Sequence, residues 1–254
     1  MPLLELRQVS KRFGGIQALS SVSFAVEQGE ILGLIGPNGA GKSTIFNLAT
    51  GVYPVSAGEI RFAENRVDGQ KPSRVCALGM ARTFQKIRIF KEMTVAENVA
   101  IGRHSRMRAG LLAALIAPRW ARQEEEEACK AAADLLQLFG LQARAEDEAR
   151  NLSHGEQRLL EMARALATQP KLILLDEPAA GLSTADSHAL MDKIGGIRAG
   201  GVTVVIIEHD MEVVMGLCDR IVVLNYGEKI FDGPPDAAQR DPTVIAAYLG
   251  GEAA

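Results

Sequence analysis

The sequence is poor in cysteine and in net charge, and each shortage argues against a class of protein. Its three cysteines, Cys76, Cys129 and Cys218, have no C-x-x-C spacing. This favours a reduced cytosolic protein over a zinc site or a disulfide framework. The net charge of −3 and the pI near 5.9 give no basic footprint, so we expect no nucleic-acid partner.

Long apolar segments are also missing. The longest apolar run, residues 109–118, is about half the roughly 20 residues that a membrane-spanning helix needs. The first ten residues lack the charged start and apolar stretch of a signal peptide. We therefore expect a protein that neither spans a membrane nor is secreted.

The apolar residues that are present predict an α/β fold. A chain of 254 residues with 47% hydrophobic content can bury one sizeable core, with or without a satellite subdomain. Short uninterrupted apolar runs at 31–35, 172–175, 202–207 and 221–224 are typical of parallel strands buried on both faces. Residues 22–26 alternate instead, which predicts a half-buried strand.

Helical patterns fill the rest of the chain, and one region contains nothing else. From about 86 to 160 no strand pattern appears, which predicts a helical subdomain inserted into a core formed by about 1–85 and 161–254. The helices predicted along the chain are 42–50, 93–101, 121–139, 155–167, 184–198, 211–217 and 243–249.

A phosphate-binding loop follows the first buried strand. Residues 36–44, "GPNGAGKST", fit G-x-x-x-x-G-K-[ST] between a predicted strand and a predicted helix, which is the context that this motif requires. The glycines let backbone N–H groups face a phosphate, Lys42 should reach the β- and γ-phosphates, and the Ser43 hydroxyl should bind Mg²⁺. The predicted nucleotide-binding residues here are Gly36, Pro37, Asn38, Gly39, Ala40, Gly41, Lys42, Ser43 and Thr44.

Polar residues end two other strands of the predicted sheet. Ligands of open α/β sheets bind at the carboxyl ends of strands, where "LILLDEP" places Asp176 and Glu177. We expect Asp176 to hold Mg²⁺ through a water molecule and Glu177 to orient or deprotonate the attacking water. His209, after the run 202–207, should lie near the γ-phosphate. Gln85 in "RTFQ" is a weaker candidate for the metal and catalytic site, because a polar residue leaving a strand is ordinarily a loop residue.

A second helix start raises a question about this site. In "LSHGEQR", residues 152–158, Ser153 and Glu156 fit the S-x-x-E capping box. It is a phosphate-receptive helix N-terminus, far along the chain from the loop at 36–44.

Six motifs in one order answer the question through a resemblance. "GPNGAGKST", "RTFQ", "LSHGEQR", "LILLDEP", "AGLS" and "IIEHD" together resemble the ATP-binding subunits of ABC transporters. The resemblance implies a P-loop NTPase (RecA-like) core with an antiparallel β subdomain and the helical insertion. It also implies a head-to-tail pair of subunits, in which Ser153, Gly155 and Glu156 of one chain contact the ATP held by the other. By the same resemblance Phe13 stacks on adenine, although a core or hairpin aromatic is the plainer interpretation.

Two departures from the family pattern are visible. His154 and Glu156 stand where LSGGQ has glycine and glutamine, and Ser183 stands where Asp or Asn is commoner. Neither change removes the backbone N–H groups or Ser153, so we expect activity to survive.

Finer features resemble the ATPases of branched-chain amino-acid-type importers. These features are "ARTFQ", the insert 103–127, "LDEPAAGLS", "IIEHDMEVVMGLCDRIVVLNYGE" and the tail "DPTVIAAYLG". The resemblance implies a peripheral location at the cytoplasmic side of the cell membrane, a second ATPase subunit (identical or a sister chain), two permeases and, indirectly, an extracytoplasmic solute-binding protein.

The sequence leaves several alternatives open. It does not identify the solute, and amides or urea are alternatives to amino acids. An ATPase of an exporter or of a lipid-extraction machine is the alternative function. A soluble ABC ATPase of translation or DNA repair is disfavoured because a second cassette and a long coiled coil are both missing. Residues 105–120 should contact the permease or membrane surface, or pack back on their own subdomain.

Overall fold

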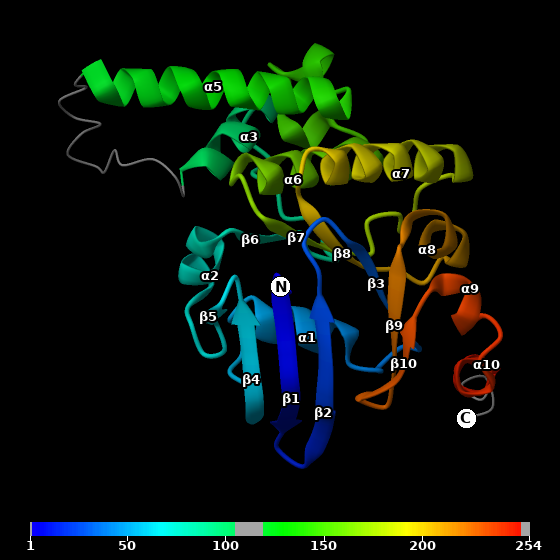
Figure 1. Cartoon of the computed structure of the whole chain (residues 1–254). Coiled ribbons are helices and arrows are strands. Elements are labelled where there is room, and N and C mark those ends of the chain that lie inside the picture. Colours follow the sequence, from blue (N-terminus) through cyan, green and yellow to red (C-terminus); the bar gives the residue numbers. More distant parts are fainter. Residues whose placement is uncertain (1, 105–118, 250–254) are drawn as a thin grey trace. The chain divides into compact units, whose positions relative to one another are not determined.

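The computed structural model describes residues 2–104 and 119–249. Residues 105–118 of the insert lie outside the described residues. The chain forms two compact units, Met1–Arg82 with Lys171–Ala254, and Thr83–Pro170 (Figure 1). The sequence placed the corresponding divisions near residues 85 and 160.

The first unit contains a mixed six-stranded sheet in the order β10-β9-β3-β8-β7-β6. Strands β3, β7 and β8 are buried along their whole lengths, as the apolar runs predicted. All neighbours are parallel except β10, which pairs antiparallel with β9. The strands are β3 (Ile31–Ile35), β6 (Met80–Arg82), β7 (Leu172–Asp176), β8 (Thr203–Ile207), β9 (Arg220–Asn225) and β10 (Glu228–Gly233).

A four-stranded antiparallel sheet completes the β structure of this unit, in the order β2-β1-β4-β5. Its buried residues, together with those of the larger sheet and of α1, form one hydrophobic core. The core confirms the predicted α/β class with an added antiparallel sheet. The strands are β1 (Leu4–Phe13), β2 (Ile16–Val26), β4 (Ala57–Phe62) and β5 (Asn65–Arg66).

Helices of the first unit begin at residues that suit helix starts. The side chains of Ser183 and Asp210 accept N–H groups at the first turns of α7 and α8. The helices are α1 (Lys42–Ala49), α2 (Pro72–Leu78), α7 (Thr184–Ala199), α8 (Met211–Leu217), α9 (Pro235–Ala238) and α10 (Pro242–Leu249).

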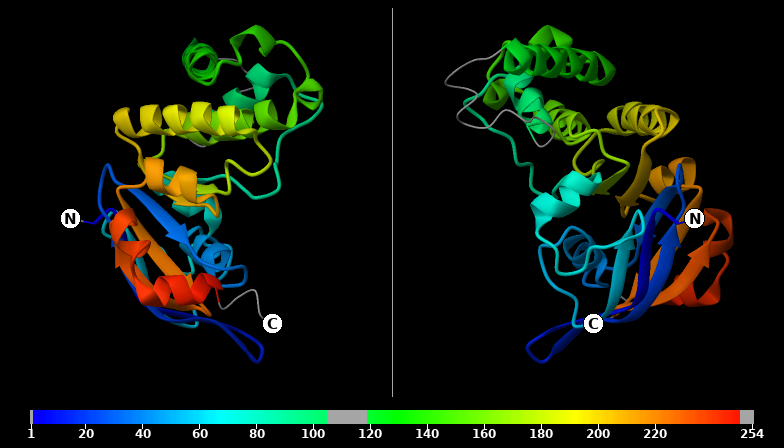
Figure 2. Two further views of the ribbon diagram at one scale, coloured as in Figure 1. Left: turned by 90° about the vertical axis from the view of Figure 1, so that its right-hand side faces the viewer. Right: turned by 60° about the vertical axis from the view of Figure 1, so that its left-hand side comes forward.

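The second unit consists of helices and turns within its described residues. Helices α3 (Val95–Arg103), α5 (Arg119–Phe139) and α6 (His154–Ala167) pack against one another (Figure 2). Two short 3₁₀ turns, Gln142–Arg144 and Ala149–Asn151, connect α5 to α6. Across the described residues of both units, helices are too short or too polar to cross a bilayer. The three cysteines are free thiols, and burial raises the pKa of Cys218 to about 12.

Candidate nucleotide site

The loop between β3 and α1 has a backbone shape that its glycines make possible. Gly36 has φ 145° and Gly41 has φ 105°, in the region that L side chains rarely adopt. A Cβ on Gly36 would lie 2.1 Å from the carbonyl oxygen of Leu224, and one on Gly41 would lie 2.6 Å from Leu19. These glycines therefore let the loop press against β9 and β2 while α1 begins directly after it.

The start of α1 is suited to an anion. Gly41 supplies no capping side chain, and the first N–H groups of any α-helix lack partners within the helix. The exposed Ser43 and the half-buried Thr44 lie in this first turn. Such an end combines N–H donors with the positive end of the helix dipole, which is the arrangement that binds phosphate.

Lys42 is the first residue of α1, and its side chain reaches back to the start of this loop. Its ammonium donates hydrogen bonds to the carbonyl oxygens of Gly36 (2.6 Å) and Pro37 (2.9 Å). Burial lowers the pKa of Lys42, and the negative charges of Glu177 and Asp176 oppose that shift. The cation and the two carboxylates that the sequence predicted for the site therefore belong to one electrostatic cluster.

Asp176 ends β7 and is held by a residue that sequence reasoning gave no role. Arg82 donates to Asp176 Oδ2 at 2.8 Å and to Asn47 at 2.6 Å. The side chains of Arg82 and Asp176 are 8% and 3% exposed. A buried carboxylate needs such partners, so Arg82 fixes the residue expected to bind Mg²⁺. The parallel pairing of β6 with β7 places Arg82 beside the end of β7. One sequence does not show this pairing, so the role of Arg82 was not predicted.

Glu177 follows Asp176 in an uncommon backbone conformation. Its φ is 49°, which a residue with a side chain seldom adopts. The Glu177 N–H donates to the carbonyl of Ile207, the last residue of β8, at 2.9 Å. His209, two residues beyond Ile207, has an exposed side chain. The ends of β7 and β8 thus bring the predicted base and the predicted histidine to one edge of the sheet.

The predicted capping box at "LSHGEQR" is confirmed in the second unit. The Ser153 N–H donates to the Glu156 carboxylate at 2.8 Å, and the Glu156 N–H donates to Ser153 Oγ at 3.3 Å. Ser153 and His154 are exposed, and Gly155 is half-buried. This helix start is therefore open to a ligand on its outer side.

Gln85 also belongs to the second unit, whereas Asp176 belongs to the first. Its backbone carbonyl accepts a 3.5 Å hydrogen bond from Arg158 of α6. The structure thus joins the segment around Gln85 to α6, the helix that begins in "LSHGEQR", and the metal role of the Gln85 side chain stays a prediction.

Phe13 lies at the end of β1 in a small aromatic cluster. It is 41% exposed, and its ring meets that of Tyr53 at 5.3 Å and 80°. The Lys11 ammonium lies 4.9 Å from the Phe13 ring centroid. The exposed ring has the freedom to stack on a base, and Tyr53, which sequence reasoning missed, supports it.

Tyr248 of α10 is a second residue that sequence reasoning missed. Burial raises the pKa of its hydroxyl, and a backbone hydrogen bond from Gly36 opposes the rise. Tyr248 also lines an apolar pocket of about 330 Å³ with Ile35, Met211 and Val244. The C-terminal helix therefore contacts the beginning of the phosphate loop.

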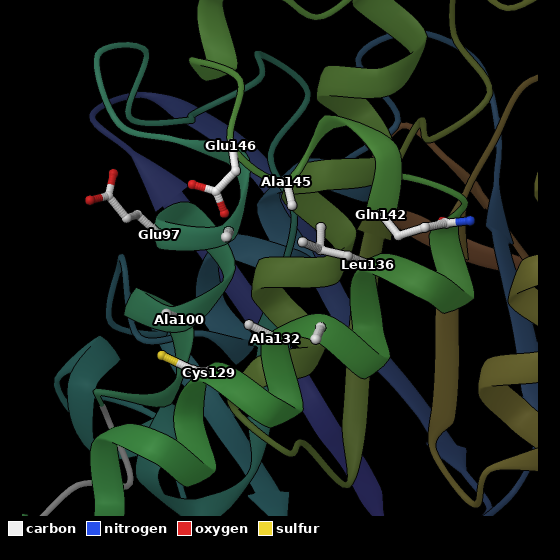
Figure 3. A pocket seen from close by; sticks show the side chains of 10 residues that line it. Glu97, Ala100, Cys129, Ala132, Leu136, Gln142, Ala145 and Glu146 are labelled. Atoms are coloured by element: carbon white, nitrogen blue, oxygen red, sulfur yellow. The ribbon is translucent and has the colours of Figure 1, made fainter. Parts of the chain in front are cut away.

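A separate pocket of about 360 Å³ lies within the second unit, between α3 and α5 (Figure 3). Ala100, Ala132 and Leu136 give it an apolar lining, and the carboxylates of Glu97 and Glu146 lie at its edge. Residues of the six sequence motifs do not line it. We therefore assign it no part in nucleotide chemistry.

The fold and the loop at residues 36–44 define a P-loop nucleotide-binding protein. The ABC transporter family matches residues 19–180, and a family described as branched-chain amino acid ATP-binding cassette transporter matches residues 228–254. The chain belongs to the ABC transporter family, as an ATP-binding cassette, and is an ATPase.

Relatives and solved structures agree with this assignment. The chain is 42% identical to the high-affinity branched-chain amino acid transport ATP-binding protein LivG of Salmonella typhimurium, and 41% identical to BraF of Pseudomonas aeruginosa. Each match spans 98% of both chains. A nucleotide-free ATP-binding cassette from an ABC transporter has a TM-score of 0.85 at 34% identity, covering 98% of this chain and 99% of that one. A dimeric cassette bound to ADP and Pi has a TM-score of 0.78 at 26% identity, covering 91% and 98%.

Proposed function

We propose that this chain is the ATP-hydrolysing subunit of an importer for branched-chain or related amino acids. The supporting observation is the match to LivG and BraF over 98% of each chain, together with the C-terminal family at 228–254. In this proposal the chain pairs with a second ATPase subunit beneath two permeases, at the cytoplasmic side of the membrane. A binding protein outside the cytoplasm delivers the solute, and the permeases and that protein select it.

The donor set at the loop fits Mg²⁺. The ion prefers oxygen ligands, keeps several waters and takes one or two carboxylates with substrate phosphates. The Ser43 hydroxyl supplies such a ligand, and the Asp176 carboxylate would hold the ion through one of its waters. Arg82 keeps Asp176 in place, and we propose Gln85 as a further ligand. When bound, the ion would neutralise charge on the β- and γ-phosphates.

We also propose roles for the other predicted site residues. The loop Gly36–Thr44 binds the phosphates, Phe13 stacks on adenine, and Glu177 takes a proton from the attacking water. His209 lies at the same sheet edge, where it would contact the γ-phosphate. Ser153, Gly155 and Glu156 act on the nucleotide of the other subunit, where the start of α6 adds N–H donors and a helix dipole.

The transport function is tested by uptake in a cell that lacks its other branched-chain amino-acid importers. Deleting the gene is expected to abolish uptake of labelled leucine, isoleucine and valine, and re-expression of the wild-type chain should restore it. A Lys42→Ala chain, expressed at the same level, is the matched control and should not restore it. Unchanged uptake of all three amino acids in the deletion strain would contradict the solute assignment while leaving the ATPase untouched.

A Ser153→Arg substitution tests the shared site. ATP binding to the isolated subunit should change little, because Ser153 acts on the partner's nucleotide, while hydrolysis by the assembled pair should be suppressed. Binding is measured by titration with a fluorescent ATP analogue, and hydrolysis by phosphate release. If the substitution weakens binding by the monomer as much as it slows hydrolysis, Ser153 acts in its own chain and the shared-site proposal is wrong.

A further inference from the structure

Glu208 is a buried carboxylate at the edge of the nucleotide site, and the roles proposed above do not use it. It directly follows β8 and is 1% exposed. Burial raises its pKa, the charge of Glu177 adds to that rise, and backbone N–H groups of Ala179 and His209 oppose it. Burying a carboxyl group costs free energy unless the group is hydrogen-bonded. The two hydrogen bonds that Glu208 accepts therefore indicate its role.

The two oxygens of Glu208 bind two different loops. Oε1 accepts the backbone N–H of Ala179 at 2.7 Å, and Oε2 accepts the backbone N–H of His209 at 3.3 Å. Ala179 is two residues beyond Glu177, the proposed base. One side chain therefore connects the segment after β7 to the segment after β8.

This connection bears on the conformation of Glu177. A non-glycine residue with φ near 49° is held there only when its surroundings fix it. Two consecutive residues, Ile207 and Glu208, hold the segment that begins at Glu177. Ile207 accepts the Glu177 N–H at 2.9 Å, and Glu208 accepts the N–H two residues further on. Without the second contact, the chain after Glu177 could relax and turn the carboxylate away from the water.

We propose that Glu208 is a positioning residue for ATP hydrolysis, which fixes the direction of the Glu177 carboxylate and aligns it with His209. This inference rests on the proposed function, in which Glu177 activates the water. Glu208 itself needs no contact with nucleotide. Its effect should therefore appear in the rate of hydrolysis and not in the affinity for ATP.

The first test compares Glu208→Gln with Glu208→Ala in the full chain, together with its sister subunit where one exists. A misplacement of about 1 Å costs about 10²-fold in rate, so kcat should fall by about 10–100-fold in the Ala variant while KM for ATP is unchanged. The Gln variant keeps the shape and one acceptor oxygen, so it should retain more activity than the Ala variant. Wild-type kcat in the Gln variant would overturn the proposal, and this variant remains informative if the Ala variant fails to fold.

Glu30→Gln is a matched control for the loss of a carboxylate. Glu30 also accepts a backbone N–H, from Glu27 at 2.7 Å, and pairs with Arg220 at 2.7 Å, but it precedes β3 at the opposite end of the sheet. Its substitution should lower the melting temperature without changing kcat. If Glu30→Gln slows hydrolysis as much as Glu208→Gln does at equal loss of stability, Glu208 has only a structural role.

Combination with Glu177→Gln separates this inference from the proposed function. Adding Glu208→Gln to a Glu177→Gln chain should cause no further loss, because Glu208 acts through Glu177. If the two losses multiply, Glu208 acts independently and the positioning role is wrong. If Glu177→Gln alone hydrolyses ATP at the wild-type rate, the proposed role of Glu177 fails. If the Glu177→Gln chain does not hydrolyse ATP while the Glu208→Gln chain keeps wild-type kcat, only the positioning role of Glu208 is wrong.

Discussion

A Glu177→Gln chain is expected to bind ATP and to hydrolyse it about 10²–10⁴-fold more slowly than the wild type, because glutamine keeps the shape but cannot accept the proton of the attacking water. Glu177 is half-buried, and its charge acts on the Lys42 ammonium. Single-turnover phosphate release measures the loss. A wild-type rate, measured with the sister subunit where one exists, would contradict the role of general base.

The stalled variant should also form an ATP-dependent dimer. With hydrolysis blocked, each ATP would remain between Gly36–Thr44 of one subunit and Ser153–Gly155 of the other. Size-exclusion chromatography with light scattering should show the dimer in ATP and a monomer in ADP, which lacks the γ-phosphate.

Adding Ser153→Arg to the stalled chain is the control for this dimer. The double variant should return to monomer in ATP, because the arginine blocks the contact with the partner's γ-phosphate. A Glu177→Gln protein that stays monomeric in saturating ATP, with its sister subunit present where one exists, would count against the shared site even if its hydrolysis is blocked.

The elements that the sequence predicted well are those in which burial and local chemistry agree. Strands 31–35 and 172–175 are continuous apolar runs, and they appear as β3 and β7 with almost the predicted bounds. The helix predicted at 155–167 begins at His154, one residue earlier, because the Ser153–Glu156 capping box fixes its start. Both signals are local, so one sequence is enough to read them.

The sequence did not predict the elements that depend on distant parts of the fold or that are too short to show a pattern. The alternation of β1 and β2 is broken at Gln8 and Ser21, each with φ 48°, so only 22–26 gave a clear pattern. Strand β6 has three residues and is recognisable as a strand only through its pairing with β7. Short helices α2 and α9 have four to seven residues, too few to show a period.

The same distinction applies to the nucleotide site. Lys42, Asp176 and Glu177 belong to motifs whose chemistry can be read from spacing, and the structure brings their charges together. Arg82, Tyr53 and Tyr248 contact Asp176, Phe13 and Gly36, respectively, through strand pairing or packing of distant segments. Their roles depend on the folded chain, so the sequence offered no signal for them beyond the family motif "RTFQ" that contains Arg82.

A Lys42→Ala chain is expected to lose tight ATP binding while it stays folded. In the structure the Lys42 ammonium donates to the Gly36 and Pro37 carbonyls, and phosphate oxygens would take these donors when nucleotide binds. Hydrogen bonds to charged groups contribute about 1.5–3 kcal/mol each, and 1.4 kcal/mol is about tenfold in affinity. Contacts to both the β- and γ-phosphates therefore predict a loss of at least about 10²-fold in Kd.

The measurement is a calorimetric titration with ATP and with ADP, on protein shown to be folded by circular dichroism. Lys229→Ala is the control, since Lys229 carries the same charge in the same unit but pairs with Asp232 in β10. That variant should bind ATP as the wild type does. Because Lys42 is expected to contact two phosphates in ATP and one in ADP, Lys42→Ala should weaken the binding of ATP more than that of ADP. Wild-type affinity for ATP in the folded Lys42→Ala chain would mean that the loop holds phosphate by its backbone N–H groups alone, and the role of Lys42 would be wrong.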